Sequence, residues 1–326
     1  MDWGAIFGNA AVELISPTTA AYAMAALGLA VHFGYTGLLN FGQAGFMALG
    51  AYGYAISILT FGFPVWGAVL VGIGASVVFA LILGIPTLRL RADYLAIVTI
   101  AAAEIVRLLF TTNVWRAVTG SANGLSGFKE GFADLNPLPP GRFGFGPFQH
   151  TSYDWWLRIV AWTVVILLAL FTWQLMRSPW GRVIKGIRED EDAVRALGKN
   201  VYSYKMQSLI LGGVFGTLAG MIFVLPRAVV PSNYQSSITF FLYAILLLGG
   251  AATVLGPIIG SVVFWVLLSF FSGFVARAVE VGWFPFMNSV QAGQLRFILV
   301  GAAIMLIVIF RPQGIFGNKK ELAFVK

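Results

Sequence analysis

The sequence predicts an all-α, polytopic integral membrane protein. We expect a helical bundle of about nine transmembrane helices, with about eight to ten as the possible range. Three observations predict this fold class. The mean hydropathy is +0.85, and 59% of the 326 residues are hydrophobic. Only 10% of the residues are charged, whereas a soluble domain carries about 25%. Several apolar stretches also reach the ~20 residues that a helix needs to cross a bilayer.

The expected spans follow these apolar stretches in chain order, near residues 17–34, 37–60, 64–86, 92–112, 155–176, 205–225, 238–254, 257–276 and 293–310. Each must be a helix, because a lone segment in lipid has no other way to satisfy its backbone hydrogen bonds. The glycine-rich stretch 37–60 leaves a broken or re-entrant helix open as an alternative. A β-barrel would need alternating segments of ~10 residues, which the sequence lacks. The whole chain, 1–326, is therefore expected to be a single transmembrane domain.

Lysine and arginine favour cytoplasmic loops, and their distribution predicts the orientation. If the N-terminus lies outside, 13 of the 21 lysine and arginine residues fall on the cytoplasmic side. They are Arg89, Arg91, the seven within segment 177–205, Arg311, Lys319, Lys320 and Lys326. Loops assigned to the outside hold Arg116, Lys129, Arg142, Arg227 and Arg277. The longest polar interval, 113–153, then becomes an extracytoplasmic loop. The basic pI of 9.8 reflects this topology, and we expect no nucleic-acid partner.

Composition also excludes several kinds of site. The chain has no cysteine, which excludes disulfides, thiol catalysis and cysteine-ligated metals. The two histidines, His32 and His150, do not suffice for a histidine metal site, so no metal is expected. No phosphate loop, HExxH or GxSxG motif is present, so no catalytic residue is predicted. If ATP drives this protein, hydrolysis occurs on another chain. No basic region precedes the first apolar run, so a cleaved signal peptide is not expected.

Segment 177–205, RSPWGRVIKGIREDEDAVRALGKNVYSYK, interrupts the apolar pattern with seven basic residues and four consecutive acids. Its apolar side chains share one face of a predicted helix, and they are Val183, Ile187, Val194 and Leu197. Arg188 and Asp192, four residues apart, are expected to pair on the other face. Gly181 precedes this helix and Gly198 ends it. The helix either lies on lipid or docks onto a protein, and the acidic run opposes anionic lipid, which favours the protein partner.

Two pairs of polar residues within expected spans are candidates for a translocation path. Glu104 and Arg107 lie three residues apart on one helix face. A charge near the bilayer centre costs ~2.5–3.5 kcal/mol, so this pair must face protein or water. It either forms a structural salt bridge or lines the passage of a zwitterionic solute. Asn40 and Gln43, also three apart, either hydrogen-bond between helices or line a polar path.

Small residues predict where helices pack closely. Gly212, Gly216 and Gly220 recur every four residues, as do Gly256 and Gly260. Such spacing puts the glycines on one helix face and lets two backbones approach closely in lipid. The same faces can also slide during gating.

Several segments resemble one known family. They are GYTGLLNFGQAGFMALGAYGYAI, ADYLAIVTIAAAEIVRLLF followed by TGSANGLSGF, GRVIKGIREDEDAVRALGKNVYSYK, LLGGAATVLGPIIGSVVF and the closing FRPQGIFG. Together they resemble the LivM-type permeases of branched-chain amino acid ABC transporters, in the family's order. The resemblance covers residues 34–316. Each segment alone is moderately specific, and their combination is specific for the family.

The resemblance implies a permease of the bacterial cytoplasmic (inner) membrane that translocates branched-chain or related amino acids. It implies three kinds of partner besides membrane lipid: a LivH-like second permease, two cytoplasmic ATPase subunits that carry ATP and magnesium, and an extracytoplasmic solute-binding protein. No cofactor is expected in this chain. The implied ATPase-docking residues are Gly181, Val183, Ile184, Ile187, Arg188, Glu189, Asp190, Ala193 and Gly198.

Other functions stay open at this point. The same superfamily serves urea and short amides, because the binding protein selects the solute. A channel needs a continuous polar pore and no docking loop. A secondary transporter needs an intramembrane carboxylate, for which Glu104 is the one candidate. A membrane-embedded enzyme would need a nucleophile or metal set, and none is recognisable.

The predicted orientation can be tested with single cysteines in this cysteine-free chain. Glu130→Cys and Asp190→Cys should react with an impermeant maleimide from opposite sides of the membrane, because the Lys/Arg bias puts 113–153 outside and 177–205 inside. Labelling of both positions from the same side would show that the number of spans between them is wrong.

Overall fold

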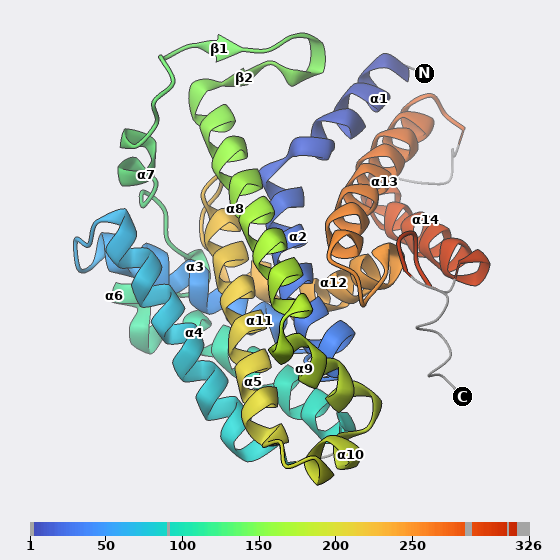
Figure 1. The fold of residues 1–326 in the computed structure, drawn as a ribbon. Helices are drawn as coiled ribbons and strands as arrows, with labels where there is room; N and C mark the ends of the chain where they lie inside the picture. Colours follow the sequence, from blue (N-terminus) through green and yellow to red (C-terminus); the bar gives the residue numbers. More distant parts are fainter. Residues whose placement is uncertain (1–2, 90–91, 284–288, 312, 318–326) are drawn as a thin grey trace.

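The computed structural model describes residues 3–89, 92–283, 289–311 and 313–317. Figure 1 shows a helical bundle, as predicted. Its longer helices are α2 (Pro17–Leu29), α3 (Gln43–Leu59), α4 (Val65–Thr87), α5 (Ala92–Thr111), α8 (Ser152–Arg177), α11 (Val201–Val224), α12 (Ser236–Gly249), α13 (Leu255–Glu280) and α14 (Ser289–Phe310). In the described part of the chain, strands occur only in the hairpin of β1 (Arg142–Phe143) and β2 (His150–Thr151).

Five helices in the described residues are long and apolar enough to cross a membrane: α4, α5, α8, α11 and α13. A sixth span forms if α1 (Trp3–Val12) and η1 (Glu13–Ile15) are joined to α2 and the π-helical segment η2 (Ala30–Tyr35) across a bend of 46°. The expected spans at 37–60, 238–254 and 293–310 coincide with shorter apolar helices. The chain is therefore an all-α, multi-pass membrane protein. Its described residues hold five or six spans of full length, so the expected count of about nine is not confirmed.

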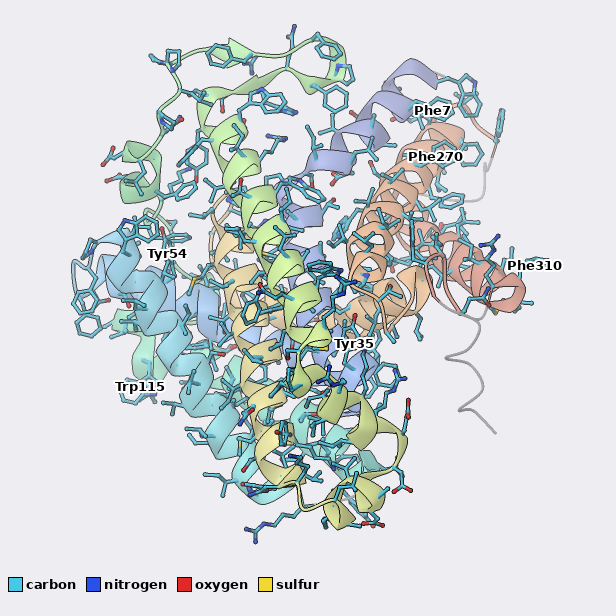
Figure 2. All side chains as sticks on the ribbon, in the orientation of Figure 1. Phe7, Tyr35, Tyr54, Trp115, Phe270 and Phe310 are labelled. Atoms are coloured by element: carbon cyan, nitrogen blue, oxygen red, sulfur yellow. The ribbon has the colours of Figure 1, made fainter. Side chains whose placement is uncertain are left out.

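The outer faces of the bundle carry large apolar side chains. Figure 2 shows Phe310 at the end of α14 and Trp115 beside α6 (Arg116–Thr119) projecting outward, and both are exposed. Exposed residues of α4 are also apolar, among them Leu70 and Ile82. A surface of this kind is favourable against lipid, which cannot hydrogen-bond to polar groups. The positions of these side chains support the membrane assignment.

Helix α11 lies at the centre of the bundle and packs most extensively against α2 and α3. Its glycines make this approach possible, as the four-residue spacing predicts. A Cβ at Gly212 would collide with the Gly28 carbonyl oxygen, and one at Gly220 would collide with that of Met47. At Gly216 a Cβ would lie 2.6 Å from Nε2 of Gln43. The missing side chains leave room both for neighbouring backbones and for a polar side chain.

The interval 113–153 lies at one end of the bundle, with the short helix α7 (Glu130–Asp134) and the β1–β2 hairpin (Figure 1). Leu125 and Val229 exchange two backbone hydrogen bonds of 2.9 Å, and the indole of Trp156 donates to the Phe132 carbonyl at 3.3 Å. The capping box of Thr151 and Asp154 begins α8. The interval is thus tied to the bundle by backbone and indole hydrogen bonds.

Segment 177–205 lies at the opposite end, where α9 (Pro179–Glu189) and α10 (Glu191–Ala196) pack beside the start of α11 (Figure 1). This arrangement agrees with the predicted separation of the two loops. Four of the basic residues that define the expected orientation, Arg91, Lys319, Lys320 and Lys326, lie outside the described residues.

Replacing Gly220 by Ala should destabilise the bundle, because the added methyl overlaps the Met47 carbonyl oxygen. Overpacking of this kind costs about 1–3 kcal/mol. Gly74→Ala on α4 is a matched control, since no atom lies within 4 Å of its Cβ position. Thermal unfolding in detergent should show a lower Tm for Gly220→Ala only. Equal Tm values for the two variants would contradict close packing along α11.

Candidate functional site

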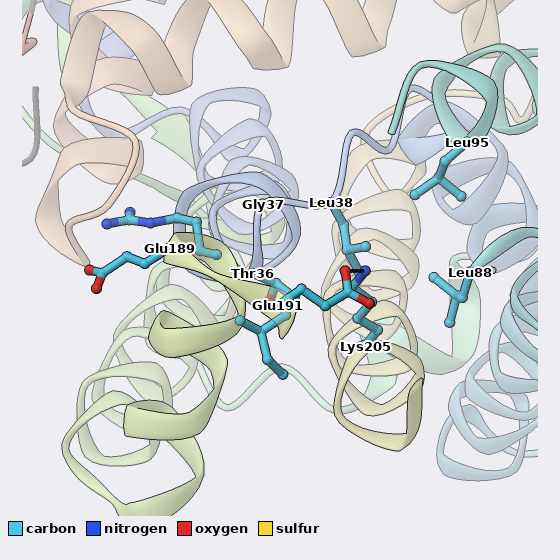
Figure 3. Close-up of a pocket in the computed structure, with 10 residues that line it drawn as sticks. Thr36, Gly37, Leu38, Leu88, Leu95, Glu189, Glu191 and Lys205 are labelled. Carbon is cyan, nitrogen blue, oxygen red and sulfur yellow. Dashed lines mark hydrogen bonds and ion pairs between the residues drawn. The ribbon is translucent and has the colours of Figure 1, made fainter. Parts of the chain in front are cut away.

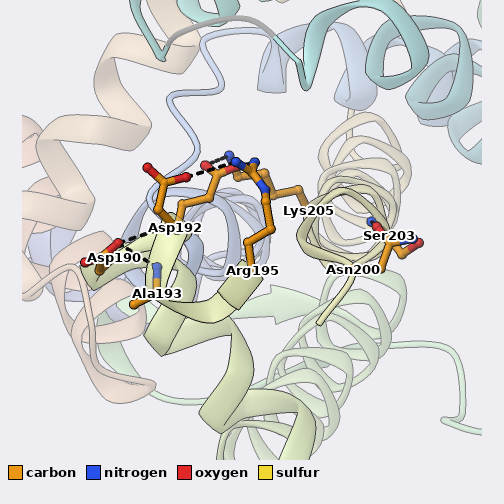
Figure 4. A network of polar contacts seen from close by, with 8 residues as sticks. Asp190, Asp192, Ala193, Arg195, Asn200, Ser203 and Lys205 are labelled. Atoms are coloured by element: carbon orange, nitrogen blue, oxygen red, sulfur yellow. Dashed lines mark hydrogen bonds and ion pairs between the residues drawn. The ribbon is translucent and has the colours of Figure 1, made fainter. Parts of the chain in front are cut away.

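Segment 177–205 is built from two short helices, whereas the sequence predicted one. Ser178 caps α9 by accepting a hydrogen bond from the amide of Gly181 at 3.4 Å, so Gly181 lies inside the helix and not before it. The helix breaks at Asp190, which has extended backbone angles. Its carboxylate accepts hydrogen bonds from the amides of Asp192 at 3.0 Å and Ala193 at 2.9 Å, which caps α10 (Figure 4). Gly198, with φ +75°, follows α10 as predicted.

The apolar side of the loop faces the rest of this chain. Ile184 is fully buried, and only 4% of Ile187 is exposed. Ile187, Val194 and Val201 form a small apolar cluster, against which Val183 packs. Leu197 does not share this face, because the break at Asp190 turns α10, and it is 79% exposed. The expectation of one continuous face of Val183, Ile187, Val194 and Leu197 is therefore wrong.

A charged network covers the outer side of the loop (Figure 4). Arg195 pairs with Asp192 at 2.9 Å and with Glu191 at 2.7 Å, and Lys205 on α11 also pairs with Glu191. The expected pair of Arg188 and Asp192 is not formed. Instead, Arg188 Nη1 donates a hydrogen bond to the carbonyl of Gly34 at 2.5 Å.

The residues implied as ATPase-docking are thus divided by burial. Those at the surface are Glu189, Asp190, Ala193 and Gly198. Those buried in this chain are Gly181, Ile184 and Ile187, and the two half-buried ones are Val183 and Arg188. The surface of the loop therefore presents carboxylates and basic side chains, among them Arg182 and Lys185, with Leu197 as its exposed large apolar side chain.

The structure brings Asn40 and Gln43 together in the middle of the bundle, where both are fully buried. Asn40 Nδ2 lies 3.0 Å from Nδ1 of His32 and donates to Oε1 of Gln43 at 3.3 Å. Gln43 Nε2 donates to the carbonyl of Gly212 on α11 at 2.9 Å. These amides connect η2, α3 and α11 by hydrogen bonds. In this conformation neither side chain reaches solvent.

His32, which is fully buried, completes this polar core. Its Nε2 lies 3.1 Å from the carbonyl oxygen of Leu209. Because a carbonyl only accepts, this nitrogen carries the proton and Nδ1 accepts from Asn40. Thr36 and Ser208 add a hydroxyl–hydroxyl contact of 2.6 Å. The one available signal was the recurrence of polar residues in HFGYTGLLNFGQ, and the π-helical turn that aligns them has no sequence pattern.

Glu104 and Arg107 form the predicted ion pair on α5. Arg107 Nε donates to both carboxylate oxygens at 3.0 Å, and Nη2 also contacts Oε1. The side chain of Glu104 is 37% exposed and that of Arg107 is 19% exposed. On the same helix, Ile97 and Ile105 are well exposed. The pair therefore lies at the edge of a helix face that the described part of this chain does not cover.

No group of three or more potential metal ligands occurs among the residues that the structure describes. The apolar helical bundle and the charged loop 177–205 at one of its ends define a multi-pass membrane protein. A family model described as "branched-chain amino acid transport system / permease component" matches residues 12–309, and the chain belongs to this family. Its members are permease subunits and not enzymes.

Known LivM proteins are similar along most of the chain. The high-affinity branched-chain amino acid transport system permease protein LivM of Salmonella typhimurium is 31% identical over 96% of this chain and 71% of its own length. The LivM of Escherichia coli is 30% identical over 92% of this chain and 69% of its length. A probable LivM of Methanocaldococcus jannaschii is 26% identical over 91% of both chains.

The ion pair on α5 can be tested by a double-mutant cycle. Removing one partner of a buried pair costs ~3–5 kcal/mol, and the exposure of Glu104 should reduce this cost. Glu104→Gln and Arg107→Met should each lower the free energy of unfolding in detergent. The loss in the double variant should be smaller than the sum of the two single losses by about 1 kcal/mol. Strict additivity of the two losses would exclude a direct interaction.

Proposed function

We propose that this chain is a transmembrane permease subunit of a bacterial inner-membrane ABC importer for branched-chain or related amino acids. The match to the permease family along residues 12–309 is the observation that carries this proposal. The printed names of the LivM relatives supply the solute class. The partners that we propose are a LivH-like permease, two ATPase subunits that hold ATP and magnesium, and an extracytoplasmic binding protein.

The ATPase is proposed to dock on the exposed side of α9 and α10. Exposed Leu197 is the apolar anchor, and Glu189 and Asp190 are rim charges. A few desolvated apolar side chains usually dominate the affinity of an interface, while rim charges set orientation and association rate. Ile184 and Ile187 support the interface from behind, because they hold α9 on the bundle.

The exposed face of α5 is proposed to meet the second permease, with the translocation path between the two subunits. Glu104 lies seven residues before the end of α5, about 10 Å along the helix axis. This depth lies within the hydrocarbon region, where lipid contact with a charged pair is costly. A protein partner or the water of the path removes that cost. A zwitterionic solute complements the pair because it also carries one charge of each sign.

Docking can be tested by placing a charge at the proposed anchor. In proteoliposomes with the partner subunits, Leu197→Asp should reduce ATPase co-purification and solute-stimulated hydrolysis about ten-fold, which corresponds to ~1.4 kcal/mol. Leu197→Met is the matched control and should retain both, since its side chain is apolar and of similar volume. Normal co-purification and coupling in Leu197→Asp would contradict the proposed anchor. Uptake measured with a panel of amino acids, urea and short amides tests the solute class.

A further inference from the structure

Helix α9 is attached to the segment in which the first span ends. Arg188 Nη1 donates to the Gly34 carbonyl at 2.5 Å. The ammonium of Lys185 lies 5.7 Å from the ring centroid of Tyr35, within the distance at which a cation is attracted to an aromatic face. A Cβ at Gly37, where φ is +75°, would lie 3.3 Å from Cγ of Arg188. Two side chains of α9 thus lie against Gly34, Tyr35 and Gly37 of a distant segment.

This segment is the end of the π-helical turn η2 (Ala30–Tyr35). Such wide turns are rare and often mark functional sites, because they disturb the regular hydrogen-bond ladder. Residues 37–42 are not helical, and the amide of Leu38 donates a hydrogen bond to the carbonyl of His32 at 2.8 Å. His32 precedes the contacted positions by two residues, and Asn40 follows them by three. A displacement at positions 34–37 therefore acts on both members of the His32–Asn40 hydrogen bond.

The junction borders a partly open pocket. A cavity of about 310 Å³ lies between this segment and the loop, with Thr36 and Leu38 on one side and Arg188 and Lys205 among the residues opposite (Figure 3). In Figure 3 the labelled side chains of Leu38, Leu88 and Lys205 lie around this space. A close-packed interior resists displacement, whereas side chains beside a cavity of this size can shift without overlap.

A simple cap is the alternative explanation of the Arg188 contact, because basic side chains often satisfy carbonyls at helix ends. Three observations argue for more than a cap. Arg188 comes from a loop 154 residues further along the chain. Arg188 bonds to the Gly34 carbonyl although Asp192, four residues further on, could have been its ion-pair partner. Asp192 pairs with Arg195 instead. Lys185, one turn earlier on the same helix, contacts the neighbouring Tyr35.

We infer that Arg188 is a positioning residue that transmits movement of the cytoplasmic loop to the η2 segment, and through it to the polar core of His32, Asn40 and Gln43. This inference rests on the proposed function, since an ATPase must move the loop. The resemblance implied that Arg188 contacts the ATPase, whereas the inference makes Arg188 a connection between α9 and the η2 segment of the same chain. The link acts by a charge-assisted hydrogen bond, which holds donor and acceptor together more strongly than a neutral one.

The test uses the complete transporter and a reporter on the segment that should move. Leu38→Cys is introduced into this cysteine-free chain, and its reaction with an impermeant maleimide is measured with and without ATP. Arg188→Gln is compared with Arg182→Gln, a matched control that alters an exposed arginine of the same helix. Co-purification of the ATPase is measured in parallel, so that docking and transmission are separated.

With native Arg188 and with Arg182→Gln, the labelling rate should depend on ATP. In Arg188→Gln this dependence should fall about ten-fold, within the range typical of coupling between sites, while the ATPase still co-purifies. Arg188→Lys should restore part of the dependence, because it keeps a charged donor. A merely structural cap would lower stability and leave the dependence on ATP unchanged, which would overturn the inference.

Three further outcomes also decide the question. Loss of ATPase binding in Arg188→Gln alone would make Arg188 a docking residue and overturn the inference. If Arg188→Gln does not fold, Lys185→Gln can be used in its place, because Lys185 is exposed and its substitution removes the contact with Tyr35. A labelling rate that depends on ATP as strongly in Lys185→Gln as in the native chain would also overturn the inference. Failure of the unaltered chain to bind any ATPase would instead contradict the proposed function.

Discussion

The interruption of the helical backbone between Tyr35 and Gln43 is the constraint on which the rest of the structure depends. Lipid offers no hydrogen bonds, so backbone groups released by the break must find partners inside the protein. Thr99 of α5 accepts from the amide of Phe41 at 3.0 Å, and Thr239 of α12 accepts from that of Ala44 at 3.1 Å. Tyr243 donates to the carbonyl of Asn40 at 3.2 Å. Two other helices, α5 and α12, are therefore held in place by hydrogen bonds to this one short segment.

The glycines of α11 follow from the same constraint. Gln43 can reach the Gly212 carbonyl because Gly216 has no side chain in its path. The same absence lets α2 and α3 approach α11 closely, which gives dispersion contacts between backbones where lipid provides no hydrophobic driving force. Close packing and buried polar groups are thus two results of one arrangement. They make the centre of the bundle specific, while the apolar outer faces of α4 and α8 tolerate many side chains.

The loop shows how an amphipathic pattern can mislead. Its apolar residues were expected to face a partner, yet Ile187 and Val194 cover Val201 of the same chain. Periodicity identifies which side of a helix avoids water, and it does not say which surface covers that side. The division into two helices depends on the Asp190 carboxylate, and Asp192 of the same run was an equally plausible capping residue. A helix pattern alone could not choose among them.

The sequence by itself determined the class of fold, because length and hydropathy leave only helices for apolar segments in lipid. It also determined the Glu104–Arg107 pair and the glycine face of α11, since both follow from positions three or four apart on one helix. Only the tertiary structure decided that Asn40 meets His32, that Arg188 reaches Gly34 and that Leu197 is exposed. These contacts join segments that no local periodicity relates, and they depend on a π-helical turn and a capped break whose geometry is set by packing.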